Sequence, residues 1–87
     1  YSAFYMSRLE FVLRKAGIEL LAVGGIVTNG GVASTVRDAH VRDIPVRIIR
    51  DGCGAFSREV HETSLASLGT IAPLVTSADL VAALVGE

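Results

Sequence analysis

An unbroken apolar run that leads into a glycine turn is the feature that most constrains the fold. Residues 20–24 read Leu-Leu-Ala-Val-Gly, and residues 28–31 read Thr-Asn-Gly-Gly. A strand with one solvent face alternates polar and apolar residues, so the unbroken run predicts a strand that is covered on both faces. Such a strand followed by a turn and a helix is typical of a parallel-sheet α/β domain.

The segments around this strand are expected to be helices. Apolar residues recur at helical spacing between residues 6 and 16, and Gly17 follows where a left-handed C-terminal cap is expected. A second helix is expected from Gly31 to about Arg42, with Asn29 in its cap region.

The rest of the chain continues the alternation. A strand is predicted at residues 46–49, ended by Asp51-Gly52, and a short strand at residues 73–75. Ser57 is expected to cap the helix between them, and Ser77 the last helix. The apolar residues of that last helix are expected to face inward, namely Leu80, Val81, Leu84 and Val85.

The predicted fold is a three-layer α-β-α domain in which three parallel strands have flanking helices. A uniformly apolar strand at residues 20–24 is unsuited to an open sheet edge, so we expect a neighbour that this chain does not supply. The chain also begins without a leading strand. Residues 1–87 are therefore expected to be the C-terminal half of one larger domain, with the N-terminal half as its partner.

Composition excludes several classes of function. The chain has 87 residues and a formal charge of −1, and its arginines are scattered, so nucleic acid is not an expected partner. The longest apolar run, at residues 20–27, is too short to span a bilayer. With no membrane segment and a single cysteine, Cys53, we expect a soluble cytoplasmic protein without a cofactor or metal.

The turn at residues 28–31 is the predicted functional edge. Ligands of open parallel sheets bind beyond the carboxyl ends of the strands. A helix that starts on glycines presents free amides, which together with the helix dipole favour an anion or a developing oxyanion. The same glycines are also explained by tight packing of the strand against the helix.

The amino-acid sequence of this region resembles that of the isochorismatase-like superfamily, also called the cysteine hydrolases. Residues 25–39 (Gly-Ile-Val-Thr-Asn-Gly-Gly-Val-Ala-Ser-Thr-Val-Arg-Asp-Ala) resemble the family's nucleophile turn and the helix after it. Residues 1–4 resemble its aromatic segment, and residues 51–57 with His61-Glu62 resemble its later loop and helix. The resemblance covers essentially the whole chain.

This resemblance implies a small-molecule substrate and a set of site residues. The family's nucleophilic cysteine aligns with Gly31, and its oxyanion hole with the amides of Val27 and Gly31. The family's cis peptide aligns with the bond between Ile26 and Val27. The family's aspartate and lysine lie before the aromatic segment, outside this chain, so the 87-residue half is expected to be inactive alone. We also expect a homo-oligomer. The residues expected to bind substrate are Phe4, Tyr1, Thr28, Asn29 and Gly30.

A glycine at the nucleophile position leaves three explanations, because a residue without a side chain cannot form a thioester. The protein resembles the isochorismatases proper, which hydrolyse a vinyl ether by acid catalysis without a covalent intermediate. The second explanation is a non-catalytic subunit that binds a ligand or holds an oligomer together. The third explanation is an engineered or divergent variant of an amide hydrolase.

Other candidates have ordinary structural explanations beside the functional ones. Cys53 is either a displaced nucleophile or a small buried thiol, and the absence of a neighbouring base favours the thiol. His40 and His61 lack a metal-ligand spacing, which favours capping or packing. Ser34 and Thr35 are expected to bond back to their own helix rather than orient a ligand.

Two further alternatives stay open. Phe4 fits a substrate pocket and a core position equally well. Asp51 follows the glycine turn at about the interval at which an acid meets ribose in dinucleotide-binding proteins, although the glycines lack the spacing of that motif.

Overall fold

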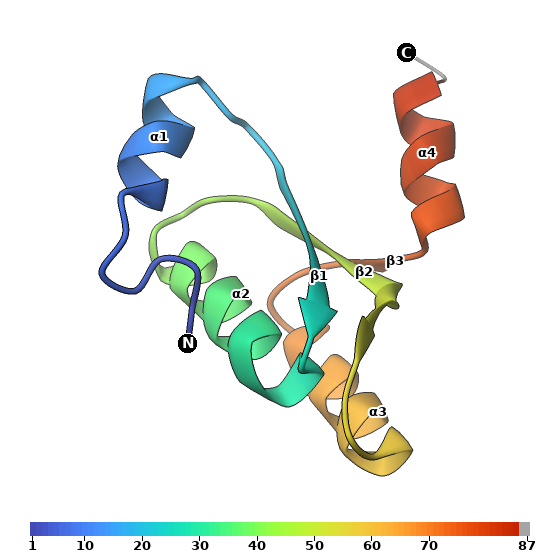
Figure 1. Ribbon diagram of the computed structural model, residues 1–87. Helices are drawn as coiled ribbons and strands as arrows, with labels where there is room; N and C mark the ends of the chain where they lie inside the picture. Colours follow the sequence, from blue (N-terminus) through green and yellow to red (C-terminus); the bar gives the residue numbers. More distant parts are fainter. Residues whose placement is uncertain (86–87) are drawn as a thin grey trace.

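The computed structural model describes residues 1–85, and its helices and strands alternate along the chain (Figure 1). The elements in order are α1 (Leu9–Lys15), β1 (Leu21–Ile26), a π-helical turn η1 (Thr28–Val32), α2 (Ala33–Val41), β2 (Val46–Gly54), α3 (Arg58–Leu68), β3 (Leu74–Val75) and α4 (Ser77–Val85).

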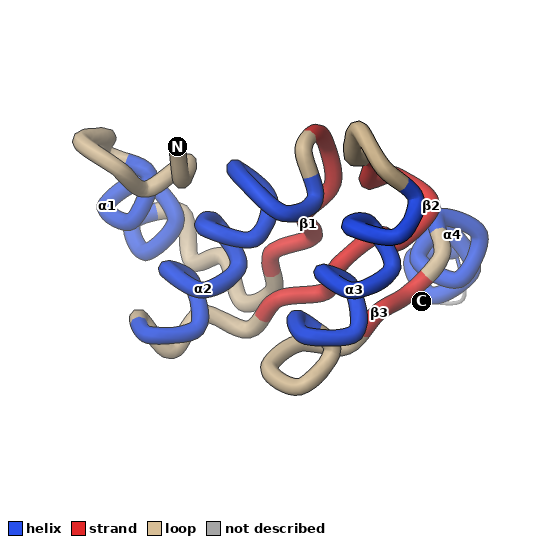
Figure 2. Tube along the Cα trace, turned by 90° about the horizontal axis from the view of Figure 1, so that it is seen from below, coloured by secondary structure: helices blue, strands red, loops and turns tan. Residues whose placement is uncertain are grey.

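The three strands form one parallel sheet in the order β1-β2-β3, which confirms the predicted fold class. Figure 2 shows α2 and α3 side by side along one side of the strands, with α1 and α4 at opposite ends of the molecule. Because parallel strands need long crossovers, α2 and α3 are the connections that run between successive strands.

The hydrophobic core lies between the sheet and the two helices α2 and α3. Ile48 of β2, Val36 of α2 and Leu68 of α3 are completely buried or nearly so. Val46 is also buried, whereas Arg47 between Val46 and Ile48 is only half-buried. The period of two along β2 therefore turns its most buried residues to the same face.

Strand β2 is longer than predicted and continues past Asp51-Gly52 to Gly54. Its pairing with β1 shifts register between Val23 and Gly25, and Gly25 then lies opposite Cys53. An irregularity of this kind lets a ladder resume after a local interruption. The turn residues Asp51-Gly52 therefore bend the strand but do not end it.

Strand β1 is an edge strand within residues 1–85, because it pairs there with β2 alone. Ala22 and Gly24 are exposed, and Ile26 is 81% exposed. The prediction that this strand is covered on both faces is thus wrong for the described chain. An apolar edge of this kind is prone to pair with further backbone.

Helix α1 begins at Leu9, later than predicted, because Met6 has a left-handed φ of 46°. Its end confirms the predicted glycine cap. Gly17 has a φ of 70°, its N–H donates to the carbonyl of Arg14 at 3.1 Å, and the N–H of Ile18 donates to the carbonyl of Leu13 at 2.9 Å. These two bonds form a Schellman motif.

Helix α4 differs from the prediction at both its cap and its apolar face. Thr76 caps it, since its Oγ1 accepts from the N–H of Asp79 at 3.0 Å. Val81 is 57% and Leu84 66% exposed, so the predicted inward face is open to solvent. Leu80 is half-buried, and the side chain of Val85 lies outside the described part. No part of residues 1–85 covers this face.

The packing at Leu68 predicts a large effect of truncation. We expect Leu68→Ala to lower the free energy of unfolding by about 2–5 kcal/mol, because it removes a buried side chain and leaves a cavity. Urea denaturation of the protein that carries this chain measures the change. The control is Val41→Ala, a similar truncation at a position that is 72% exposed. Equal effects of the two substitutions would contradict the assigned core.

Candidate functional site

The candidate site begins where β1 ends. The peptide bond between Ile26 and Val27 is cis, as the resemblance implies. The chain then forms η1, in which Gly30 leaves the helical region with φ −119° and ψ −107°. Regular helix starts only at Ala33, two residues after the predicted start at Gly31.

Backbone hydrogen bonds hold this turn together. The carbonyl of Val27 accepts from the N–H of Gly30 at 3.0 Å and from the N–H of Val32 at 3.3 Å. No side chain caps η1 or α2, and Asn29 lies exposed within η1, so its predicted place in the cap region is wrong. The Val27 carbonyl is therefore turned into the loop that precedes α2.

Thr28 ties the turn to helix α3. Its side chain is fully buried, and Oγ1 lies 2.7 Å from Nδ1 of His61. The hydroxyl of Thr28 is thus engaged inside the protein. The sequence analysis did not predict this contact, because the two residues are 33 positions apart.

A hollow of about 370 Å³ runs beside Gly31 along the open edge of β1. The predicted site residues that line it are Gly31 and Tyr1. Its other walls are mostly apolar, which suits the body of a small organic molecule. The remaining lining residues are Ala3, Leu9, Leu21, Ala22, Val23, Gly24, Ile26, Val32 and Thr35.

Gly31 leaves little room for a side chain. A Cβ added there would lie 3.2 Å from the carbonyl oxygen of Tyr1, closer than an ordinary van der Waals contact. A Cβ added at Gly30 would lie 2.8 Å from Cγ2 of Val27, so a side chain at position 30 would force Val27 to move. A side chain at position 31 would thus require the Tyr1 carbonyl to move by a few tenths of an ångström.

The aromatic residues near the start of the chain lie partly in the core and partly at the surface. Phe4 is buried in the core, and the Arg42 guanidinium lies 5.0 Å from its ring centroid. Tyr1 is 99% exposed and stacks on Tyr5 with ring centroids 5.1 Å apart. Phe4 therefore occupies the core position that was weighed for it. Neither Phe4 nor the residues Val27, Thr28, Asn29 and Gly30 line the hollow, and their contacts with a substrate stay predictions.

Cys53 lies on β2 opposite Gly25 and packs against the core. Burial raises the pKa of its thiol, and the Asp51 carboxylate raises it further, while a backbone hydrogen bond from Gly25 partly offsets both. A thiol is a good nucleophile only as its thiolate. These surroundings favour the small structural thiol over the displaced nucleophile.

The carboxylate of Asp51 binds Ser77, the first residue of α4. Its Oδ1 accepts from the N–H of Ser77 at 2.7 Å, and its Oδ2 accepts from the Ser77 hydroxyl at 2.6 Å. These hydrogen bonds, the one from the hydroxyl first, hold the pKa of the carboxyl below its usual range. A carboxylate with both oxygens engaged is a poor ribose acceptor, which weakens the dinucleotide alternative.

The remaining polar candidates serve the local structure. Thr35 is buried, and its Oγ1 accepts from the N–H of Ala3 at 2.9 Å, so it fixes the aromatic segment instead of bonding to its own helix as expected. Ser34 is exposed. His40 is exposed near the end of α2, whereas His61 makes the contact with Thr28.

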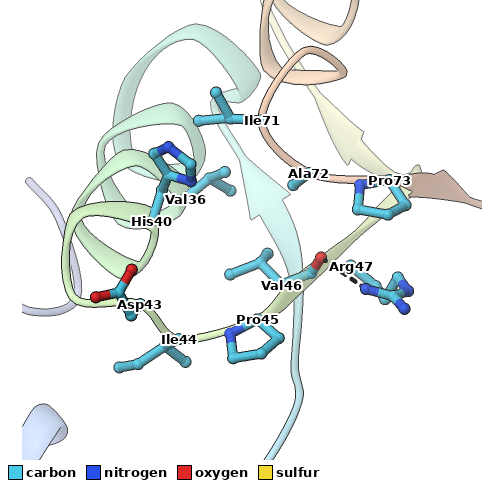
Figure 3. A pocket seen from close by; sticks show the side chains of 10 residues that line it. All are labelled: Val36, His40, Asp43, Ile44, Pro45, Val46, Arg47, Ile71, Ala72 and Pro73. Carbon is cyan, nitrogen blue, oxygen red and sulfur yellow. Dashed lines mark hydrogen bonds between the residues drawn. The ribbon is translucent and has the colours of Figure 1, made fainter.

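A second hollow, of about 320 Å³, lies at the opposite ends of the strands (Figure 3). His40, Asp43 and Arg47 are its polar residues, and the side chains between them are apolar. It is formed where α2 leads into β2 and where residues 71–73 lead into β3, at the amino ends of these strands. Because ligands of parallel sheets bind at the carboxyl ends, the hollow beside Gly31 is the candidate site.

Within residues 1–85 the side chains form no cluster of three or more metal-ligating groups. Over the same residues, no helix has the length and hydropathy that crossing a bilayer requires.

The parallel sheet and the glycine turn at the carboxyl end of β1 place the chain among Rossmann-like α/β proteins. The model of the Isochorismatase domain matches residues 1–79. The chain therefore belongs to this family of isochorismatase-like hydrolases.

Individual relatives agree with this assignment. The chain is 42% identical over 65 residues to the uncharacterized isochorismatase family protein YecD of Escherichia coli O157:H7, a match that covers 75% of this chain and 35% of YecD. It is 38% identical over 65 residues to enterobactin synthase component B of Escherichia coli K12, covering 75% of this chain and 23% of that protein.

The fold agrees with a solved structure as well. A putative hydrolase of the isochorismatase family from Chromobacterium violaceum superposes with a TM-score of 0.93 at 37% identity, covering 99% of this chain and 51% of that one. The chain thus spans about half of this structure and less of the two relatives above.

The raised pKa of Cys53 predicts slow alkylation. At pH 7 we expect iodoacetamide to modify Cys53 more slowly than a free cysteine, whose pKa is about 8.5, because less thiolate is present. The rate should increase as the pH rises above that value. Peptide mapping by mass spectrometry follows the modification, and the urea-unfolded protein is the control. Equally fast modification of the folded and unfolded protein at pH 7 would contradict the prediction.

The lowered pKa of Asp51 predicts a loss of stability in acid. Since the folded pKa lies below the unfolded value of about 3.9, the stabilisation is present above that value and disappears as the pH falls through the folded pKa. We expect Asp51→Asn to destabilise the protein at pH 7 and to have less effect below pH about 3.9. Urea denaturation between pH 3 and pH 7 measures the difference in the free energy of unfolding between wild type and Asp51→Asn. In a Ser77→Ala background this difference should be smaller. A difference that is the same at pH 3 and pH 7 would exclude this role.

Proposed function

We propose that this chain is the C-terminal half of a hydrolase domain that cleaves a vinyl ether of a small molecule without a covalent enzyme intermediate. The observation that carries the proposal is Gly31. It stands at the nucleophile position implied by the resemblance, and a Cβ there would meet the Tyr1 carbonyl at 3.2 Å. Amide hydrolysis through a thioester requires a thiol at that position. A reaction in which water is the nucleophile requires no thiol there.

The reaction needs a proton donor and a water molecule. An acid protonates the terminal carbon of the vinyl double bond, and water adds to the resulting oxocarbenium carbon and returns a proton to the conjugate base of the acid. The hemiketal then breaks its carbon–oxygen bond as its hydroxyl proton passes to the leaving oxygen, which leaves a ketone and an alcohol. The amides of Val27 and Gly31 are proposed to hold an oxygen of the substrate. The hollow beside Gly31, with its mostly apolar walls, is proposed to hold the substrate's body.

The acid is proposed to come from the N-terminal half of the domain. Two features support a missing half: β1 pairs with β2 alone within residues 1–85, and its residue Ile26 is 81% exposed. A further strand beside β1 would cover this edge and close the open side of the hollow, which bears five residues of β1. The 87-residue half is therefore expected to be inactive alone.

The assembly and location of the protein are also part of the proposal. Val81 and Leu84 leave an apolar face of α4 exposed, which supports a homo-oligomer. The single, unpaired Cys53 suits the reducing cytoplasm.

The test uses the complete domain with isochorismate and, separately, with nicotinamide. We expect pyruvate to be released from isochorismate, measured by a coupled lactate dehydrogenase assay, and no ammonia from nicotinamide. Intact mass spectrometry during turnover should show no covalent adduct. Cys53→Ala is the control and should leave pyruvate release unchanged, because Cys53 does not line the hollow.

Two outcomes would overturn the proposal. Ammonia release with loss of activity in Cys53→Ala would identify a displaced thiol nucleophile and an amide hydrolase. No turnover of either compound would favour the alternative of a non-catalytic subunit that binds a ligand or holds an oligomer together.

A further inference from the structure

We propose that His61 is a positioning residue of the site, which acts by holding Thr28 and, through it, the turn that carries the amides of Val27 and Gly31. Nδ1 of His61 lies 2.7 Å from Oγ1 of Thr28. The threonine is fully buried and His61 is half-buried. This inference rests on the proposed function, because it gives that turn a role in catalysis.

The contact joins two elements that meet only in the tertiary structure. Thr28 is the first residue of η1, and His61 lies in the first turns of α3. Helix α3 is itself fixed, since Ser57 caps it and Leu65 and Leu68 are buried in the core. A rigid helix therefore holds one end of a short turn that has no side-chain cap of its own.

The hydrogen bond is short enough to define the turn. A hydroxyl both donates and accepts, and a neutral imidazole nitrogen does one or the other, so the pair is satisfied in either direction. The neighbouring carbonyl of Val27 accepts from the N–H groups of Gly30 and Val32. The turn is thus held by backbone bonds on one side and by His61 on the other.

Loss of the hydroxyl should disturb the turn without removing it. The amides of Val27 and Gly31 are proposed to hold an oxygen of the substrate, and they thereby set the position of the vinyl carbon relative to the acid that protonates it. A displacement of about 1 Å at a catalytic group costs on the order of 100-fold in rate. A small movement of residues 27–31 would therefore lower the rate of the chemical step more than it weakens binding.

The first experiment measures kcat and KM for isochorismate in the complete domain. We expect Thr28→Val and His61→Leu to lower kcat by roughly 10- to 100-fold, with a much smaller change in KM. Thr28→Ser keeps the hydroxyl, and His61→Asn places an amide near the position of Nδ1, so both should recover most of kcat. The matched controls are His40→Leu and Thr70→Val, which alter the same residue types away from the turn and should keep wild-type kcat.

The second experiment does not depend on activity. Hydrogen exchange followed by NMR reports how firmly the N–H groups of Gly30 and Val32 are held. We expect their exchange to be about tenfold faster in Thr28→Val than in Thr70→Val, with amides of the core helices unchanged. If Thr28→Val and His61→Leu prevent folding, Thr28→Ala and His61→Ala replace them in both experiments, because they remove the same hydrogen bond, and the same losses are expected.

The outcomes separate the two proposals. A wild-type protein that releases no pyruvate contradicts the proposed function, and the exchange rates then decide whether His61 holds the turn. Wild-type kcat in folded His61→Leu, or equal losses in His40→Leu, would overturn the positioning role. Unchanged protection of the Gly30 and Val32 amides would overturn it as well.

Discussion

The packing of α2 and α3 against β2 is the interaction on which the rest of the structure depends. Ile48, Val36 and Leu68 meet there without access to solvent. Burial of side chains of this size is worth about 1.5–3 kcal/mol each, and it fixes both helices relative to the sheet. Because the two helices follow β1 and β2 directly, their positions also set the turns at the carboxyl ends of those strands.

This packing determines the geometry of the site. Helix α3 brings His61 to within 2.7 Å of the buried Thr28, and the aromatic segment brings the Tyr1 carbonyl beside Gly31. These contacts come from parts of the chain that are far apart in sequence. The result is a turn that is held from both sides around a position with no side chain. The backbone N–H groups of this turn are proposed as the donors that the described chain offers to a ligand.

One side of the described chain is open. Strand β1 has a single strand neighbour within residues 1–85, and large apolar side chains of β1 and α4 face solvent. A parallel sheet is normally covered on both faces. The hollow beside Gly31 runs along the same open edge, so the exposed strand edge and the surface proposed for the substrate are continuous. The proposed N-terminal half would therefore complete the sheet and the site together.

The sequence by itself determined the order of helices and strands, the parallel sheet, the glycine cap at Gly17 and the place of the candidate turn. Local patterns decide these features, because periodicity and capping depend on residues a few positions apart. It did not determine that β2 continues past Asp51-Gly52, since a register shift against β1 restores the pairing there. It also missed that Asp51 binds Ser77 and that His61 binds Thr28. Only the tertiary structure decided these contacts, because packing across the core alone brings such distant residues together.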